Sequence, residues 1–569
     1  MSQKPWDTYN VLWNMAPAAL QDLVARHAGK WVLDTETDGL MVRGRDSRHS
    51  AWYVGLTPLG TRTCIVYDKA HWPDAKPVVE QMQLIGQNMR FDVHAADLNV
   101  QRWEDTLGYS YFNSMSALKG LDDLARRRRR PKIKTPKGLK GPKLATNRIA
   151  ELEPAKVGLY LADDCIFTGE VYQDMQKPDL AHDQALERVV ANMEMRGVRI
   201  YPDRLDEFEA LAIETESQVR SELAGFGFDG NPGSPKQVLT WLGTFMDTSK
   251  LPPTKTSRST GSKALKNIHL PQTEALLAVR SAVKLQNGFI ASVRAHMTED
   301  GMIYPSVHTS KHDAGGTGTG RWSMSDPPLH QAPKRHPVLG PLARRCITSS
   351  TWYTCGADFR QIEPRVAAAM SECPVQLAAF AAGRCPYTET AAVVLGKTYA
   401  QVTPTERSNA KAVNLGILNG MGPSGLSIQL GCTLRQARRW LDDYLMSLPT
   451  FAEWLEDTKA TARTFGVLRT CAGRTRIFGS DESTDTKAVS VVVQGSAAEL
   501  IRRAVVALDE AGTEPFLQMH DEVLCQNRLT TGQDVATIMT QAANEAFPDV
   551  LGAVDFAAKG GEGDSWAAV

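Results

Sequence analysis

The chain has 569 residues, of which 42% are hydrophobic and 22% are charged, and its acidic and basic residues cancel to a formal net charge of zero. This length favours several compact domains over one, and no apolar run approaches the ~20 residues that span a bilayer. The first ten residues lack the basic-then-apolar pattern of a secretory signal, and the nine cysteines include no CxxC pair. We therefore expect a cytoplasmic protein with reduced thiols and no zinc site.

The first acidic motif follows an apolar run that starts at Trp31 and is predicted to be a strand. Asp34 and Glu36 are two residues apart, so both carboxylates project to one side of that strand. Two neighbouring anions repel each other, and a metal cation is the usual reason for keeping them together. Alone the motif is a weak signal, because a solvated turn often carries the same residues.

Two later motifs add further carboxylates. Asp92 opens a helical pattern four residues after Asn88, and Tyr160 and Asp164 share one face of a predicted helix. In this order the motifs resemble the 3′–5′ exonuclease domain of the DEDDy type, and residues 103–114 resemble the helix between its second and third motifs. The resemblance implies a metal-bound water, oriented by Tyr160, that attacks the terminal phosphodiester. It also implies that two divalent cations are bound by Asp34, Glu36, Asp92 and Asp164.

Residues 126–143, RRRRRPKIKTPKGLKGPK, carry ten cations and no anion. Three prolines and two glycines predict a loop rather than a helix. One interpretation is a solvated insertion. The other is a loop that contacts the phosphates of a nucleic acid and releases their counterions, and the nuclease-like motifs on either side favour it.

Residues 353–365, YTCGADFRQIEPR, alternate in the way of a half-buried strand that ends at Asp358. A charged cluster follows, in which Pro364 is tolerable in the first turn of a helix. Farther on, EPFLQMHDEVLCQN predicts two strands joined by a tight turn at Asp521. Two strands that each end in an aspartate can hold two metal ions between them.

Between these stretches, TERSNAKAVNLGILNGMG repeats selected residues every four positions, which places them on one helix face. The face is cationic at its start and would suit a triphosphate opposite two metal ions. A helix with solvated basic residues would show the same spacing. The residues concerned are Arg407, Lys411, Leu415 and Asn419.

Together the three stretches resemble motifs A, B and C of the family A DNA polymerases. The resemblance implies that Asp358 and Asp521 bind two Mg²⁺ ions, with Mn²⁺ as an alternative, and that the Phe359 carbonyl is a further ligand. The ions would activate the primer 3′-OH and hold the triphosphate of an incoming dNTP. Arg407 and Lys411 would grip the phosphates, and Lys411 is also the candidate proton donor to pyrophosphate.

The same resemblance implies further substrate contacts. Glu363 would pack under the incoming sugar and exclude a 2′-OH. The chain departs from the family pattern at Leu415, where Phe or Tyr is expected, and at Asn419, where a Tyr usually stacks near the templating base. Residues 317–333 resemble a minor-groove motif in which His330 replaces a Gln. The remaining residues expected at the nucleotide or the DNA are Gln361, Arg321, Gln494, Arg474, His520 and Glu522.

The expected fold class is α/β and α+β in several domains. An RNase H-like exonuclease domain with a mixed sheet would be followed by a right-hand polymerase with an antiparallel-sheet palm, helical fingers and a helical thumb. No 5′-nuclease domain and no large thumb insertion is apparent, which predicts a compact replicative enzyme of a bacteriophage or an organelle-type system, with the phage type favoured. The expected bounds are 1–180 for the exonuclease domain, 181–335 for the thumb and the approach to the palm, 336–385 and 484–569 for the palm, and 386–483 for the fingers.

The predicted function is template-directed DNA synthesis from a primer 3′-OH, with 3′–5′ proofreading. The expected partners are primer–template DNA and dNTPs, with a replisome helicase–primase or a single-strand-binding protein as further candidates. The protein would act as a monomer in the cytoplasm, that of the host cell if a phage encodes it. Two alternatives are a 3′–5′ exonuclease whose C-terminal region grips nucleic acid, and a non-catalytic replication scaffold. Neither alternative explains why both sets of motif residues are complete.

Overall fold

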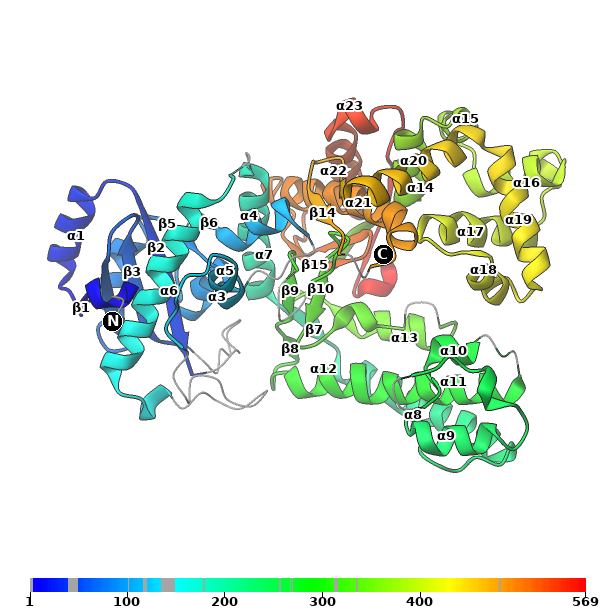
Figure 1. The fold of residues 1–569 in the computed structure, drawn as a ribbon, viewed down its shortest axis with the longest axis horizontal. Helices are drawn as coiled ribbons and strands as arrows, with labels where there is room; N and C mark the ends of the chain where they lie inside the picture. The colour runs from blue at the N-terminus through cyan, green and yellow to red at the C-terminus, as the bar shows by residue number, and fades with distance from the viewer. Residues whose placement is uncertain are drawn as a thin grey trace.

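The computed structural model describes residues 4–38, 50–100, 102–115, 120–134, 149–177, 180–254, 257–266, 268, 270–311, 316–333, 336–479 and 482–569. Figure 1 shows an N-terminal part built around one sheet, a second sheet near the middle of the molecule, and two helical arms that extend from the middle to the same side. Within the described ranges, no helix combines the length and apolar character needed to span a membrane.

The N-terminal part contains the expected mixed sheet, with six strands in the order β1-β4-β3-β2-β5-β6. At its middle, β2 (Lys30–Thr37) pairs antiparallel with β3 (Ala51–Pro58) and parallel with β5 (Gln83–Gly86). Residues 31–33 of β2 are fully buried, so the carboxylates of this strand begin where its apolar run ends. The other strands are β1 (Asn10–Trp13), β4 (Thr63–Asp68) and β6 (Trp103–Asp105).

Helices cover both faces of this sheet, and β2 shows how the sequence specifies that. Trp31 and Leu33 point into a core with α1, α2 and α3, whereas Val32 points into a second core with α4 and α6. Side chains that alternate between two apolar cores produce the continuous hydrophobic run seen in the sequence. The helices are α1 (Pro17–Arg26), α2 (Trp72–Val79), α3 (Met89–Ala95), α4 (Thr106–Asn113), α5 (Leu121–Arg127) and α6 (Pro154–Asp174).

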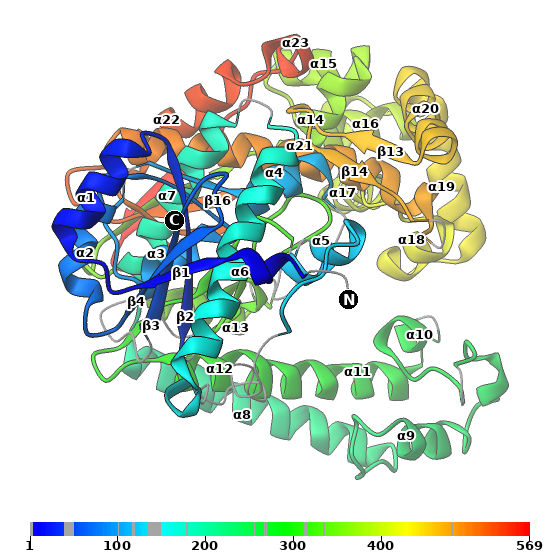
Figure 2. The same cartoon turned by 60° about the vertical axis from the view of Figure 1, so that its left-hand side comes forward.

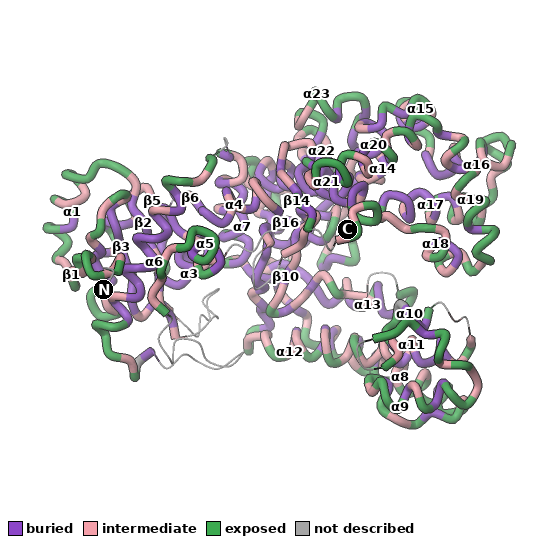
Figure 3. Tube along the Cα trace, in the orientation of Figure 1, coloured by how far each residue is buried: buried purple, intermediate pink, exposed green. Residues whose placement is uncertain are grey.

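The lower arm in Figure 1 is a bundle of helices that follows α7 (Ala181–Arg196). Its two long members, α8 (Pro202–Gly225) and α11 (Pro271–Lys284), pack against each other and share a small apolar core of their own. Figure 3 shows that much of this arm is exposed, in contrast to the two sheets. The shorter helices are α9 (Pro235–Leu242), α10 (Ser262–Lys266), α12 (Ala291–His296) and α13 (Leu339–Arg345).

The central sheet has four antiparallel strands in the order β15-β16-β12-β17. Every residue of β12 (Thr354–Phe359) except Asp358 is buried, so the prediction of a half-buried strand is wrong. Both faces are covered because β12 lies in the largest core of the described chain and α22 (Gly532–Glu545) packs across it. The other strands are β15 (Pro515–Met519), β16 (Glu522–Cys525) and β17 (Ala558–Gly563).

The upper arm in Figure 1 consists of helices that follow β12, most of which begin with a proline. Proline suits the first helical position, because its fixed φ is helical and its missing N–H has no partner there. The helices are α14 (Ile362–Ser371), α15 (Pro374–Ala381), α16 (Pro386–Leu395), α17 (Pro404–Leu418), α18 (Pro423–Leu430), α19 (Leu434–Ser447) and α20 (Pro449–Phe465).

The long helix α21 (Thr484–Glu510) returns the chain from this arm to the central sheet, and Figure 2 shows it behind the N-terminal part. A hairpin precedes it, and small two- and three-residue strands join α7 and the lower arm to the middle of the molecule. The strands of the hairpin are β13 (Val467–Arg469) and β14 (Thr475–Ile477), and the small strands are β7 (Val198–Ile200), β8 (Met302–Ile303), β9 (Ser306–His308), β10 (Ser323–Ser325) and β11 (Ile347–Thr348). The short helix α23 (Pro548–Leu551) follows α22 and packs against it and α14.

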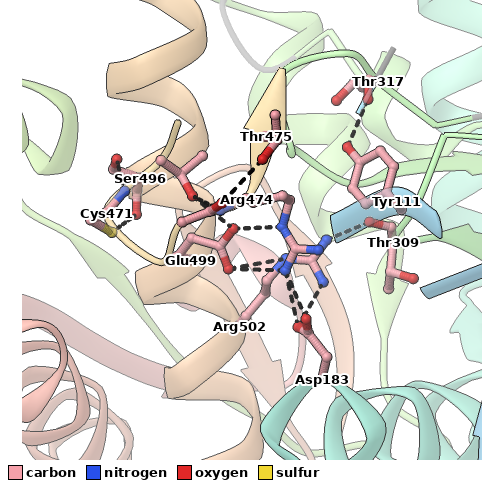
Figure 4. A network of polar contacts seen from close by, with 12 residues as sticks. Tyr111, Asp183, Thr309, Thr317, Cys471, Arg474, Thr475, Ser496, Glu499 and Arg502 are labelled. Carbon is pink, nitrogen blue, oxygen red and sulfur yellow. Dashed lines mark hydrogen bonds and ion pairs between the residues drawn. The ribbon is translucent and has the colours of Figure 1, made fainter. Parts of the chain in front are cut away.

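A buried network of ion pairs links α7, α21 and the β13–β14 hairpin next to α4 of the N-terminal part (Figure 4). Arg474, next to β14, contacts Glu499 of α21 at 2.7 Å and Asp183 of α7 at 2.9 Å. Beside it, the Tyr111 hydroxyl of α4 donates a hydrogen bond to the Thr317 carbonyl at 2.8 Å. Buried charges are kept only when they are paired, so this junction fixes four elements relative to one another.

Candidate active sites

The N-terminal acidic cluster is formed by Asp34 and Glu36 of β2 and Asp164 of α6. One oxygen from each of the three carboxylates lies within 4.8 Å of the other two. The two-residue spacing on β2 places Asp34 and Glu36 on one face of the strand, and α6 packs across that strand to bring in the third. Three predicted residues from distant parts of the chain therefore meet.

The electrostatics of this cluster favour a bound cation. Burial and the neighbouring carboxylates raise the pKa of Asp34 well above its usual range. Burial raises the pKa of Asp164 to about 6, although the Lys132 ammonium lowers it, and burial raises the pKa of Asp92 to about 8. Oxygen ligands in this number suit Mg²⁺ or Mn²⁺, whose charge would relieve the repulsion, so the donor set fits a divalent metal.

Asp92 is buried beside the three-member cluster rather than within it. It lies on α3, and its Oδ1 accepts a hydrogen bond from the Thr35 hydroxyl at 2.7 Å. Tyr160 is one turn before Asp164 on α6, where its ring lies 4.7 Å from the Lys132 ammonium. All five residues predicted from the nuclease-like motifs thus lie in one region.

The basic run 126–143 differs from its prediction where the structure describes it. Its first two arginines belong to α5, because helical residues before them extend the helix, and residues 135–143 lie outside the described ranges. Arg130 contacts Asp163 at 3.0 Å and Glu170 at 2.6 Å, and the Lys132 Nζ lies 2.5 Å from the Asp164 Oδ1. These two cations neutralise acidic side chains of the protein itself.

A second site lies at the ends of the central strands, in a cleft of about 1180 Å³. Asp358 is near the end of β12, and Asp521 is in the turn between β15 and β16. The Phe359 N–H donates to the Asp521 carbonyl at 3.0 Å, so the backbone holds the two aspartate-bearing segments side by side. His520 adopts a φ of 66° to make that turn tight. Asp358, Phe359, His520 and Asp521 all line the cleft.

The opposite wall of the cleft comes from the helical arm. Arg407, Lys411 and Leu415 lie on successive turns of α17 and face the cleft, as the four-residue spacing predicted. Tyr387 of α16 was not predicted: its buried ring lies 5.8 Å from the Arg407 guanidinium and 6.0 Å from the Lys411 ammonium. No spacing rule links Tyr387 to α17, because the two helices meet only in the fold.

A model of DNA polymerase family A matches residues 204–568. The chain belongs to this family. It is 29% identical to a thermostable DNA polymerase I of Thermus caldophilus over 420 residues, which cover 70% of this chain and 48% of that protein. A thermostable DNA polymerase I of Thermus filiformis is 30% identical over 402 residues, which cover 66% and 46%. The chain spans about half the length of these curated relatives.

The fold is similar to that of the POL domain of Pol1 from M. smegmatis, solved in complex with DNA primer-template and dNTP. The TM-score is 0.80 at 21% identity, and the match covers 98% of this chain and 99% of that one. The family A sequence model begins at residue 204, so the N-terminal acidic cluster lies outside the region that it matches.

Other predicted residues of this family A chain form contacts within the cleft. Glu363 forms an ion pair with Arg321, and both line the cleft, as does Gln361. The Asn419 side chain accepts from the Gln494 amide at 2.6 Å and donates to the Leu415 carbonyl at 2.6 Å. These two hydrogen bonds engage both the oxygen and the nitrogen of the Asn419 side chain.

Three residues predicted to contact DNA are bonded to other groups of the protein. Arg474 is 2% exposed and forms ion pairs with Asp183 and Glu499. In this structure its guanidinium therefore holds buried elements together and is not accessible to a template strand. Glu522 is buried and pairs with Arg344 at 3.2 Å. The third is His330, whose ring bonds to the Gln518 carbonyl at 3.0 Å and stacks on His520, with ring centroids 5.4 Å apart.

Proposed function

We propose that this chain is a template-directed DNA polymerase that also removes nucleotides from the 3′ end of DNA. The observation that carries the proposal is the cleft in which two strand-end aspartates face two exposed cations of α17. Asp358, Asp521, Arg407 and Lys411 come from separate elements, and a gripping surface alone would not require all four together. Membership of family A and the similarity in fold to a polymerase domain support the same reaction.

At the cleft, Asp358 and Asp521 would hold two Mg²⁺ ions, with the Phe359 carbonyl as a further oxygen ligand. When bound, the ions would supply an activated primer hydroxyl and a stabilised pyrophosphate leaving group. Arg407 and Lys411 would bind the triphosphate, and Lys411 would donate a proton to pyrophosphate. The remaining residues of the cleft would shape the pocket for the sugar and the base pair.

Glu363 would exclude a 2′-OH, with its carboxylate held by Arg321. Gln361 would contact the nucleotide, and His520 the primer terminus. Asn419 and Gln494 are bonded to each other, so we propose that they act as one polar unit at the minor-groove side of the pair. Minor-groove acceptors are similar for all base pairs, so such a unit would test the shape of the pair.

In the N-terminal part, Asp34, Glu36, Asp92 and Asp164 would hold two divalent cations. When bound, the ions would supply a nucleophilic water for hydrolysis of the terminal phosphodiester. Tyr160 would orient that water from α6. We therefore propose an RNase H-like exonuclease domain at residues 1–180, ahead of a thumb, palm and fingers with the bounds given above.

The partners that this proposal implies are primer–template DNA and dNTPs. A replicative role, a phage-type origin, a monomeric state, a cytoplasmic site of action and replisome partners stay predictions from the sequence. Mg²⁺ is the expected ion at both sites, and Mn²⁺ is its alternative because both ions take oxygen ligands.

The test is a primer-extension assay with and without dNTPs, on a primer labelled at its 5′ end. Extension with dNTPs and shortening without them are the expected results. Shortening alone would favour the nuclease with a nucleic-acid-gripping C-terminal region, and a primer unchanged in both conditions would favour the non-catalytic scaffold.

A further inference from the structure

Residues 130–133, here called the strap, cross α6 beside the N-terminal acidic cluster. Arg130 fastens its start, through Asp163 at 3.0 Å, Glu170 at 2.6 Å and the Tyr9 hydroxyl at 2.8 Å. The Ile133 N–H fastens its end, by donating to the Asp163 Oδ2 at 2.8 Å. The strap is therefore held on both sides of Lys132.

Lys132 points from the strap into the cluster. Its Nζ lies 2.5 Å from the Asp164 Oδ1 and 4.7 Å from the centre of the Tyr160 ring, and its side chain is 7% exposed. A second acid, Asp122 of α5, lies 3.5 Å from the same ammonium and is 60% exposed. Lys132 thus has one buried partner within the cluster and one at the surface.

A divalent metal would meet this ammonium at Asp164. The same carboxylate would have to serve both cations, and two cations a few ångströms apart repel each other in a partly buried site. Metal binding therefore requires the ammonium to move away from Asp164. Asp122 offers it a place to go, because a lysine side chain is flexible and needs only a short displacement to pair there.

We propose that Lys132 is an internal cation that competes with the divalent metal for Asp164, so that the strap sets the metal concentration at which the N-terminal site fills. The inference rests on the proposed metal-dependent exonuclease. The exonuclease activity would then depend on metal concentration. At low concentration Lys132 stays on Asp164 and the site is metal-free, and at high concentration the metal displaces Lys132 from Asp164. Lys132 acts in this through Asp164, as a positioning residue.

The test measures Mn²⁺ binding by calorimetry in the full-length chain. Asp358→Asn and Asp521→Asn are introduced throughout, so that the cleft does not contribute to the titration. In this background Lys132→Met, which keeps an unbranched side chain one atom shorter and removes its charge, should bind Mn²⁺ about tenfold more tightly or better. The matched control is Lys134→Met, an exposed lysine two residues away, which should leave the affinity unchanged.

Two further measurements protect this test. The rise in melting temperature on replacing EDTA with Mn²⁺ should be larger for Lys132→Met than for the parent, because tighter binding stabilises the folded state more. Asp122→Asn removes the alternative partner and should weaken Mn²⁺ binding. If Lys132→Met fails to fold, Lys132→Gln serves in its place.

Equal or weaker Mn²⁺ affinity in the Lys132 variant would overturn the inference. A different result would overturn the proposed exonuclease instead: no Mn²⁺ binding at this site in either the parent or the Lys132 variant, or binding that persists after Asp34→Ala. The two failures are distinguishable, because the first requires a metal site that Asp34→Ala removes and the second shows that there is none.

Discussion

The N-terminal acidic cluster and the cleft of the central sheet both gather carboxylates, and they balance the charge in different ways. In the cluster, the Lys132 ammonium lies 2.5 Å from Asp164, and Arg130 is paired with the adjacent Asp163. In the cleft, Arg407 and Lys411 are exposed on α17 and form no ion pair with any residue in the described ranges. In the cluster a protein cation is bonded to Asp164, whereas in the cleft the two cations of α17 are not bonded to Asp358 or Asp521.

The difference shows which charged residues can bind a ligand and which are already bonded within the protein. A cation that is already bonded to a carboxylate of the protein contributes to the fold. A ligand can bind at that place only if it breaks the existing ion pair. A cation that is exposed across a cleft from two aspartates can bind a phosphate directly, because no ion pair within the protein has to be broken first. The loss of a charged side chain should therefore have different effects at the two sites.

The largest effect is expected in the cleft. Asp358→Asn or Asp521→Asn should reduce primer extension about a thousandfold or more, because each removes a ligand for ions worth several kcal/mol to the transition state. Degradation of single strands from the 3′ end should persist. The measurement is the rate of both reactions for each variant. Loss of both activities in a folded variant would mean that extension and degradation depend on the same site.

The reciprocal change is made in the cluster. Asp34→Ala together with Glu36→Ala should remove excision of a mismatched 3′ nucleotide and leave correct extension within about twofold. Two of the three carboxylates that meet within 4.8 Å are lost, and Asp164 with the neighbouring Asp92 offers too few oxygen ligands to hold two metal ions. Single-turnover excision assays measure the loss. Unchanged excision would place the nuclease chemistry elsewhere in the chain.

Much of both sites could be predicted from local spacing. The two-residue step of Asp34 and Glu36 on a strand, and the four-residue step from Arg407 to Leu415 on a helix, correctly placed those side chains on common faces. The turn at Asp521 follows from two short strands on either side of it. These features depend on backbone geometry over a few residues, which the sequence contains directly.

The partners of buried cations could not be predicted in this way. Arg474 pairs with Asp183, a residue 291 positions earlier, and an arginine in a short hairpin looks the same whether it faces DNA or a buried acid. The run at 126–130 mixes both kinds: Arg130 is held by acids of α6, while Arg127 and Arg129 are exposed. Only the packed structure separates cations that are already paired from those that are available.

Comparing a paired cation with an available one tests this distinction directly. Arg474→Ala leaves Asp183 and Glu499 buried with less compensation, which should cost about 3–5 kcal/mol and lower the melting temperature by roughly 5 °C or more. Arg407→Ala should leave the melting temperature unchanged and raise the KM for dNTP about ten- to a hundredfold.

Thermal melting and steady-state kinetics on both variants give the comparison, with Arg469→Ala as the control. Arg469 is an exposed arginine of β13, in the same hairpin that precedes α21. A stable Arg474 variant with weakened template binding would restore the DNA-contact role that the sequence predicted for this arginine.

The apolar part of the cleft provides the next comparison, at Leu415. Leucine has no hydroxyl to replace a missing sugar 3′-OH, so we expect the protein to discriminate against dideoxynucleotides by about ten- to a hundredfold. Leu415→Tyr should recover much of that factor, although overpacking of the half-buried position could cost ~1–3 kcal/mol. The control is Leu415→Phe, which adds the ring without the hydroxyl. The ratio of kcat/KM for dNTP and ddNTP decides, and a wild-type ratio near one would show that another group makes the contact.

The smallest effect concerns the exposed members of the basic run. Arg127→Ser with Arg129→Ser removes two cations that face solvent, and each phosphate they neutralise contributes about 0.7–0.9 to the slope of log affinity against log salt. We expect the slope for DNA binding to flatten by about one to two units, with no sequence preference. Arg130→Ser is the internal comparison, because that guanidinium is already paired within the protein. It should leave the slope unchanged and loosen the strap instead, seen as faster amide hydrogen exchange at Ile133. Equal flattening in both variants would mean that Arg130 leaves its acids to bind DNA, and an unchanged slope in both would mean that Arg127 and Arg129 are only solvated.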